Sequence, residues 1–136
     1  MNGADVRAYS NKKNGTDRVV RSCANFKVNE FACSDGSDVV FVSPDLVKVL
    51  QQIRDYFKLP VTVNSGYRTP THNKKVGGAE YSQHLYGMAA DISVKGVKPE
   101  RVYDFVDGLL KNTGGVGLYD TFVHVDVRKV KSRWNG

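Results

Sequence analysis

Three potential metal ligands limit the possible folds of this chain more than any other feature. They fall in or beside two segments whose patterns predict β-strands. His84 and Asp91 lie seven residues apart, and His124 follows in the second segment. In residues 87–94, period-two alternation predicts a strand that turns Asp91 to one face and apolar side chains to the other. The same alternation in residues 123–128 turns His124 away from the valines. If these strands pair, Asp91 and His124 share a cleft, which His84 reaches through a short connection.

The residue types in this set indicate a metal site of the catalytic kind. Two neutral imidazoles and one carboxylate can bind zinc and leave one coordination position for water. Zinc lowers the pKa of that water toward ~7 and polarises a carbonyl, the combination that amide hydrolysis needs. A lone histidine near a turn is more often a hydrogen-bonded structural residue, but two of the chain's three histidines fall in this pattern. The sequence therefore predicts a zinc site made of His84, Asp91 and His124.

The patterns of the remaining elements predict a small α+β domain. Apolar residues recur at spacings of three and four from Leu46 to Phe57, which predicts a helix that begins at the capping Ser43 and ends before Pro60. A second helix is expected at residues 99–110 and a short strand at residues 61–65. Because helices and strands are segregated, we expect a largely antiparallel sheet with the helices packed on one side and the zinc cleft on the sheet.

The two ends of the chain and its glycine-rich segment are expected to be less regular. Residues 1–25 are polar without sustained periodicity, which predicts an arm or a pair of edge strands. Residues 114–117 predict a flexible turn, and Trp134 is expected to pack as a lid on the core beyond the last strand. His72 matches no ligand position and is expected to be an exposed loop histidine.

Composition narrows the classes of function. The 136 residues are 40% hydrophobic and 25% charged, which suits one globular domain, and no apolar run is long enough for a membrane span. The net charge of +6 favours anionic polymers such as nucleic acid or an acidic cell wall, or is simply a solvated basic surface. We expect no nucleic-acid partner, because the chain lacks a basic recognition helix and aromatic-basic interleaving. The start shows no secretory signal pattern, and Cys23 and Cys33 are expected to be reduced thiols.

Five short motifs between about residue 26 and residue 134 match one known pattern. They are Ser65-Gly-Tyr-Arg68, Val76-Gly-Gly78, Ser82-x-His84-x-x-Gly87-x-Ala89-x-Asp91, Gly115-Val-Gly117-x-Tyr119 and Phe122-Val-His124-Val-Asp126. Together they resemble the M15 family of zinc D-Ala-D-Ala carboxypeptidases and L-alanyl-D-glutamate endopeptidases, especially its small phage and bacterial members. The third motif is specific, whereas the glycine turns alone are weak. The resemblance implies a fold like that of hedgehog and the D-Ala-D-Ala peptidases, with a zinc peptidase domain at 26–136 after an arm at 1–25.

The resemblance also implies roles for individual residues. His84, Asp91 and His124 match the zinc ligands. Arg68 matches an arginine that faces the substrate and the developing oxyanion, a role that a fixed guanidinium suits. The alternative for Arg68 is a turn arginine paired with a surface carboxylate. Ser82 and Tyr67 are expected to contact substrate, although Ser82 is nearly as well explained as a turn hydroxyl.

The general base is where the sequence departs from the family. Many members carry Glu or Asp three residues before the last histidine, and this chain has Thr121 there. A threonine hydroxyl cannot accept a proton from zinc-bound water at neutral pH. Asp120 is the first candidate, provided that a bulge turns it toward the metal. Asp126 is the second candidate, with support of a ligand histidine as its alternative role.

The function implied is a zinc-dependent peptidase that cuts an amide bond in the peptide stem of bacterial peptidoglycan, in phage- or prophage-related cell-wall lysis. We expect a monomer made in the cytoplasm and released to the wall through a holin. The alternative is a catalytically inactive, zinc-bearing cell-wall-binding module, which the missing carboxylate at Thr121 favours. The sequence leaves open whether the bond is terminal, as for a carboxypeptidase, or internal.

Overall fold

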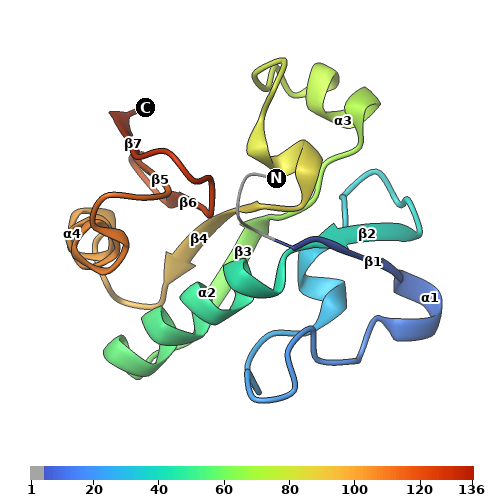
Figure 1. Ribbon diagram of the computed structural model, residues 1–136, viewed down its shortest axis with the longest axis horizontal. Coiled ribbons are helices and arrows are strands. Elements are labelled where there is room, and N and C mark those ends of the chain that lie inside the picture. The colour runs from blue at the N-terminus through green and yellow to red at the C-terminus, as the bar shows by residue number, and fades with distance from the viewer. Residues whose placement is uncertain (1–4) are drawn as a thin grey trace.

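A five-stranded sheet forms the centre of the protein in the computed structural model, which describes residues 5–136 (Figure 1). Its strand order is β3-β4-β6-β5-β7, and every neighbouring pair is antiparallel except β5 and β7. The strands are β3 (Val61–Ser65), β4 (Ala89–Val94), β5 (Gly115–Leu118), β6 (Val123–Asp126) and β7 (Ser132–Asn135). The predicted α+β class with a largely antiparallel sheet is confirmed.

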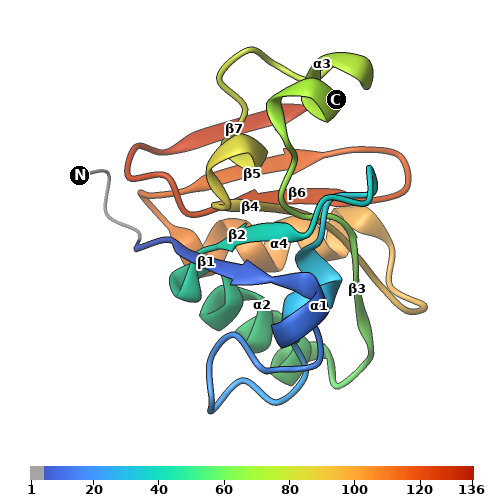
Figure 2. The same ribbon diagram turned by 90° about the vertical axis from the view of Figure 1, so that its right-hand side faces the viewer.

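Two helices cover one face of this sheet, α2 (Pro44–Phe57) and α4 (Pro99–Leu110), as Figure 2 shows. Both match the residue ranges expected from apolar spacing. Helix α2 begins where Ser43 Oγ accepts a hydrogen bond from the backbone N–H of Leu46, and it ends at Lys58 in the left-handed conformation. The apolar spacing and the cap at Ser43 thus predicted the helix and its start correctly.

Strand alternation separates a core face from a functional face of the sheet. On β4, Ala90, Ile92 and Val94 are buried in the hydrophobic core, while Asp91 lies on the opposite side of the strand. On β6 the same rule places Val123 and Val125 in the core. The side chains of a metal site can therefore be held on one face by a sheet whose other face is packed against helices.

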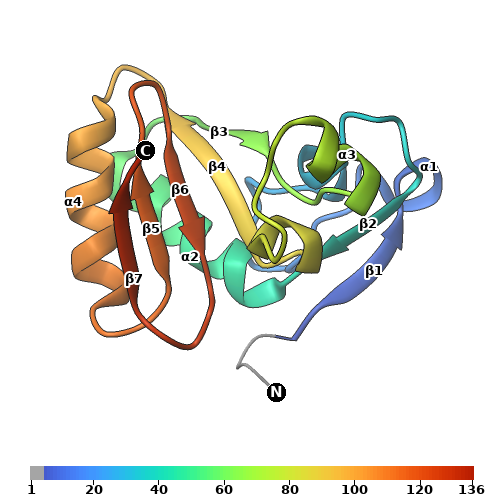
Figure 3. The same ribbon diagram turned by 90° about the horizontal axis from the view of Figure 1, so that it is seen from above.

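The segment expected to be an N-terminal arm is tied into the fold. Strand β1 (Arg7–Ser10) pairs antiparallel with β2 (Val39–Val42) in a separate two-stranded sheet, rather than with a second strand inside residues 1–25 (Figure 3). A short helix, α1 (Asn11–Asn14), follows, and Val19 and Cys23 lie in the core. Residues 1–4 of the expected arm lie outside the described residues. Cys23 and Cys33 are buried free thiols.

The prediction of a flexible turn at residues 114–117 was wrong, because Gly115–Leu118 forms strand β5 at the interior of the sheet. The glycines serve packing here: a Cβ on Gly115 would collide with the Asp126 carboxylate, and one on Gly117 would collide with the Trp134 indole. Strand β7, which carries Trp134, was not expected.

Further short helices are η1 (Val28–Phe31), α3 (Pro70–Lys75) and η2 (Gln83–Tyr86). None of the helices in the described part of the chain is long and apolar enough to cross a membrane.

Candidate metal centre and its cleft

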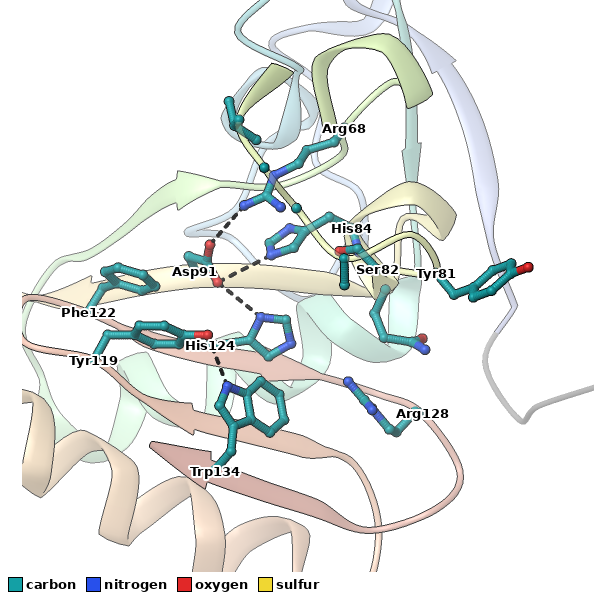
Figure 4. Close-up of a pocket in the computed structure, with 15 residues that line it drawn as sticks. Arg68, Tyr81, Ser82, His84, Asp91, Tyr119, Phe122, His124, Arg128 and Trp134 are labelled. Carbon is teal, nitrogen blue, oxygen red and sulfur yellow. Dashed lines mark hydrogen bonds and ion pairs between the residues drawn. The ribbon is translucent and has the colours of Figure 1, made fainter. Parts of the chain in front are cut away.

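His84, Asp91 and His124 converge as the sequence predicts (Figure 4). Each offers one ligand atom, and these atoms all lie within 4.8 Å of one another. Asp91 on β4 stands directly opposite His124 on β6 in the antiparallel register, and η2 delivers His84 to the same point. All three side chains are buried. Two imidazoles and a carboxylate in this arrangement form a donor set that zinc prefers.

Local backbone geometry aims the ring of His84 at this point. Ser82 caps η2 by accepting a hydrogen bond from the backbone N–H of His84, and Gly87 ends the helix with φ +69°. Gly87 also passes so close to the backbone at Phe41 that a Cβ would collide with it. The Nδ1 of His84 donates to the carbonyl oxygen of Gly66 at 2.8 Å, because a carbonyl only accepts. Its Nε2 lone pair therefore faces Asp91 Oδ1, 3.3 Å away.

His124 is oriented in the same manner with its two nitrogens exchanged. Its Nε2 donates to Oδ2 of the buried Asp126 at 2.7 Å, and its Nδ1 lies 3.1 Å from Asp91 Oδ1. Support of one ring nitrogen by a carboxylate fixes the tautomer and raises the basicity of the other nitrogen. His84 thus presents Nε2 and His124 presents Nδ1 to the same centre.

The electrostatics of the centre call for a positive charge. Burial by itself raises the pKa of Asp91, but its close contacts with His124 and His84 outweigh burial and hold that pKa well below its usual range. Burial lowers the pKa of His124, yet its contacts with Asp126 and Asp91 raise that pKa above its ordinary value. With neutral imidazoles, three electron-pair donors face one another, which is unfavourable until a cation lies between them. The donor set therefore fits a divalent metal.

Arg68 lies beside the centre, where the resemblance places it. Its Nε donates to Ser65 Oγ at 3.2 Å, one terminal nitrogen donates to Asn73 Oδ1 at 3.3 Å, and the other lies 3.4 Å from Asp91 Oδ2. Gly78 leaves room for this arrangement, because a Cβ there would collide with Asn73. The arginine therefore pairs with the buried Asp91 and not with a surface carboxylate. These contacts restrain its guanidinium, and Arg68 lines the cleft.

A cleft of about 520 Å³ opens above the centre. One wall is the loop that contains residues 76–83, and the other carries Tyr119, Phe122, Arg128 and Trp134. Among the described residues that line it, Asp91 is the only carboxylate. Arg68 and Arg128 stand on opposite walls. The cleft therefore suits a substrate with anionic groups.

The structure does not bring Asp120 to the centre. Tyr119 N–H donates to the carbonyl oxygen of Phe122, which closes a tight turn and leaves Asp120 exposed at its tip, without the bulge that its assignment as the base requires. Asp120 lines a separate pocket instead.

Asp126 is fully buried on the far side of the His124 ring from Asp91, and its oxygens already accept from His124, Arg128 and the backbone N–H of Gly115. Its geometry is that of a support for His124.

The other candidate residues divide between cleft and core. Ser82 lines the cleft, so a contact with substrate stays a prediction. Tyr67 is buried against Phe41, with ring centroids 5.3 Å apart, and is not among the residues that line the cleft. His72 lies on α3, where its Nε2 is 3.1 Å from Ser34 Oγ.

Sequence reasoning missed the part that Trp134 plays. Its indole lies on the cleft side of β7, with its ring centroid 5.0 Å from that of His124, and not over the core. Arg128 stacks on the same indole at 5.5 Å and binds Asp126 through Nε and a terminal nitrogen. Trp134 is the only apolar residue among the four of β7, so no alternation in the sequence marked this segment as a strand.

A sheet-mounted His-Asp-His centre in a cleft, with an arginine beside it, is the kind of site that a hydrolytic metalloenzyme needs. Residues 24–126 match the sequence model of the Peptidase M15 family, and the chain belongs to that family, as its motifs indicated. The zinc D-Ala-D-Ala carboxypeptidase of Streptomyces albus G is 58% identical over 33 residues, 24% of this chain and 13% of the relative. The probable peptidoglycan L,D-endopeptidase MepK of Haemophilus influenzae is 35% identical over 83 residues, 56% of this chain and 43% of the relative. The chain thus matches less than half the length of either relative.

Proposed function

We propose that this chain is a zinc-dependent peptidase that cleaves an amide bond in the peptide stem of bacterial peptidoglycan. The observation that carries the proposal is the fixed presentation of His84 Nε2, Asp91 Oδ1 and His124 Nδ1 to one point in an open cleft. Membership of the M15 family supports the reaction class, and the names of both relatives support the substrate class.

The chain's own residues prepare this site before substrate arrives. Bound zinc supplies an acidified water and polarises the scissile carbonyl. Gly66 and Asp126 hold the hydrogens on the outer nitrogens of the two histidines, so neither ring has to reorient. Such preorganisation is the main source of electrostatic catalysis, because no reorganisation is needed as charge develops.

Arg68 is placed to meet negative charge on the substrate. Ser65 and Asn73 restrain its guanidinium, while the contact with Asp91 at 3.4 Å is long for a charge-assisted hydrogen bond. A substrate oxygen that becomes charged competes well for its free N–H groups. We assign Arg68 the stabilisation of the tetrahedral oxyanion.

The charge of the cleft also suits a stem peptide. Arg68 and Arg128 flank the centre, and the chain carries a net charge of +6. Peptidoglycan stems carry carboxylates, so the field of the protein favours their approach. We propose that the protein acts at the bacterial cell wall as a monomer, in phage- or prophage-related lysis after holin-type release from the cytoplasm.

A second candidate function is a zinc-bearing module that binds cell wall without cleaving it. The observation that favours it is the lining of the cleft: apart from the ligand Asp91, no carboxylate of the described residues is available there to take a proton from water. The two functions share the centre and the substrate class, and they differ only in turnover.

Digestion of purified peptidoglycan fragments separates the two functions. We would compare metal-free, zinc-restored and Asp91→Asn protein, with mass spectrometry of the stem peptides. For a peptidase, only the zinc-restored wild type should release new amines; free D-alanine would identify a carboxypeptidase and paired internal fragments an endopeptidase. Binding of the fragments by zinc-loaded protein without any new product would establish the binding module instead.

A further inference from the structure

Tyr119 and Trp134 form a hydrogen-bonded pair on the wall of the cleft opposite Arg68 (Figure 4). The indole Nε1–H of Trp134 donates to the Tyr119 hydroxyl oxygen over 2.9 Å. An indole nitrogen can only donate, so the phenol oxygen is the acceptor and its own hydrogen must point elsewhere. Within residues 5–136, no protein group accepts that hydrogen. The hydroxyl is therefore a donor offered to whatever occupies the cleft.

Several contacts hold this donor in place. The Tyr119 ring stacks on Phe122 with centroids 4.5 Å apart and an interplanar angle of 9°. The ring also lies close to Gly136, where a Cβ would overlap it, and Gly117 leaves room for the Trp134 indole, which a Cβ there would meet. A hydrogen-bond donor fixed in this manner loses little entropy when it meets its acceptor.

The position of the pair relates it to the reacting bond. Trp134 packs beside the ligand His124, and Tyr119 lines the same cleft as the three ligands. Arg68 follows β3 at one edge of the sheet, whereas Trp134 lies on β7 at the other edge. A substrate held over the centre thus has the guanidinium on one side and the phenol on the other.

We propose that the Tyr119 hydroxyl is a catalytic residue that donates a hydrogen bond to the scissile carbonyl oxygen as it becomes an oxyanion, and that Trp134 is its positioning residue. This inference rests on the proposed function for the identity of the substrate. No bond is made or broken at Tyr119; its proton stays on the phenol oxygen throughout. The donor complements Arg68 from the opposite wall.

The test compares Tyr119→Phe, Trp134→Phe and the control Tyr56→Phe, which removes a phenol from the exposed surface of α2, outside the cleft. The probe is a phosphinate analogue of the stem peptide, whose tetrahedral anionic group copies the oxyanion. Tyr119→Phe keeps the stacked ring and should retain zinc and the affinity for product peptide. Its affinity for the phosphinate and its kcat should both fall by roughly a hundredfold, the typical cost of one oxyanion donor, with little change in KM.

Trp134→Phe keeps an aromatic ring over Gly117 but cannot orient the phenol, so it should show a smaller fall in the same two quantities. Equal phosphinate affinity in Tyr119→Phe and wild type would overturn the inference. If Tyr119→Phe fails to fold or to hold zinc, Trp134→Phe decides: unchanged phosphinate affinity and kcat would overturn the role of the pair. If wild type releases no product from any stem peptide, the proposed function fails, while the phosphinate measurement still decides whether Tyr119 is a donor to an anionic tetrahedral group.

Discussion

Asp126 accepts a hydrogen bond from Nε2 of His124, two residues earlier on the same strand, over 2.7 Å. Both residues point to the cleft face of β6 because side chains on a strand alternate with period two. Asp126 is fully buried, and burial raises its pKa, but the bonds from His124 and Arg128 dominate and keep that pKa well below its usual range. A charged carboxylate in this place is positioned to support the His124 ring rather than to take a proton from the attacking water.

Asp126→Asn should therefore act through the metal. An amide nitrogen or oxygen in this place cannot supply the same charge to the His124 ring, so zinc affinity should fall by about 10- to 100-fold. Turnover should recover when zinc is supplied in excess. Competition with a chelator measures the affinity, and a zinc-loaded but inactive Asp126→Asn protein would transfer the role of general base to Asp126.

Asp120→Asn is the matched carboxylate variant outside the cleft. Asp120 lies at an exposed turn and lines another pocket, so we expect this variant to keep zinc, fold and most of the wild-type kcat. Loss of turnover with zinc retained would show the opposite. The turn at residues 119–122 would then have to rearrange on substrate binding so that Asp120 acts as the base.

Replacing any one zinc ligand should remove metal and activity together. His84→Ala, Asp91→Ala and His124→Ala each leave two ligands, too few for tight binding at a site that keeps a position open for water. Metal analysis after dialysis against a trace of zinc should show about one zinc per wild-type chain and far less in each variant. Stoichiometric zinc in all three variants would place the metal elsewhere.

Arg68→Ala should separate catalysis from metal binding. We expect kcat/KM to fall by on the order of a hundredfold or more, with zinc content unchanged, because the lost donors act on the oxyanion. Arg68→Lys should recover only part of the rate, since an ammonium cannot bridge Ser65, Asn73 and the substrate as a guanidinium does. Turnover close to wild type in Arg68→Ala would make this arginine structural.

The candidate ligand set and both long helices could be predicted from the sequence because both depend on local patterns. The ligands follow strand alternation, and the helices follow apolar spacing and capping residues. Alternation predicted only the faces on which Asp91 and His124 lie; the pairing of β4 with β6 was a condition of the shared cleft, and the structure shows it with the two residues opposite each other. The glycine-rich strand β5 could not be predicted from local patterns. Its glycines are explained by Asp126 and Trp134, which reach them from other strands, and these neighbours are known only once the fold is known.

The positions of Asp120 and Tyr67 differ from those that the sequence led us to expect, for a related reason. Whether Asp120 faces the metal depends on the closure of one turn by the Tyr119–Phe122 hydrogen bond, which propensity does not specify. A tyrosine such as Tyr67 is a residue type often found in a cleft. Here it follows Gly66, which packs so closely against the Phe31 backbone that this segment lies in the core. In both cases one backbone contact, Tyr119–Phe122 or Gly66–Phe31, determines where the side chain lies, and the local sequence pattern does not reveal it.

The segment that carries Arg68 offers a pH-dependent prediction. Asp35 Oδ2 accepts from Thr69 Oγ1 at 2.6 Å, and its other oxygen accepts from the backbone N–H of Ser37 at 2.9 Å. These bonds, that from Thr69 first, lower the pKa of Asp35 from 3.8. Since the folded-state pKa lies below the unfolded one, the stabilisation is present above about pH 3.8 and is lost as pH falls below it.

Asp35→Asn should therefore lower the melting temperature at pH 7, and the difference from wild type should shrink as the pH is brought below 3.8. The effect should be modest because Asp35 is exposed and the solvent screens its charge. Thermal unfolding of the two metal-free proteins across this range makes the comparison, since the other carboxylates titrate equally in both. A difference in melting temperature that stays constant with pH would show that the Asp35 charge does not stabilise the segment next to Arg68.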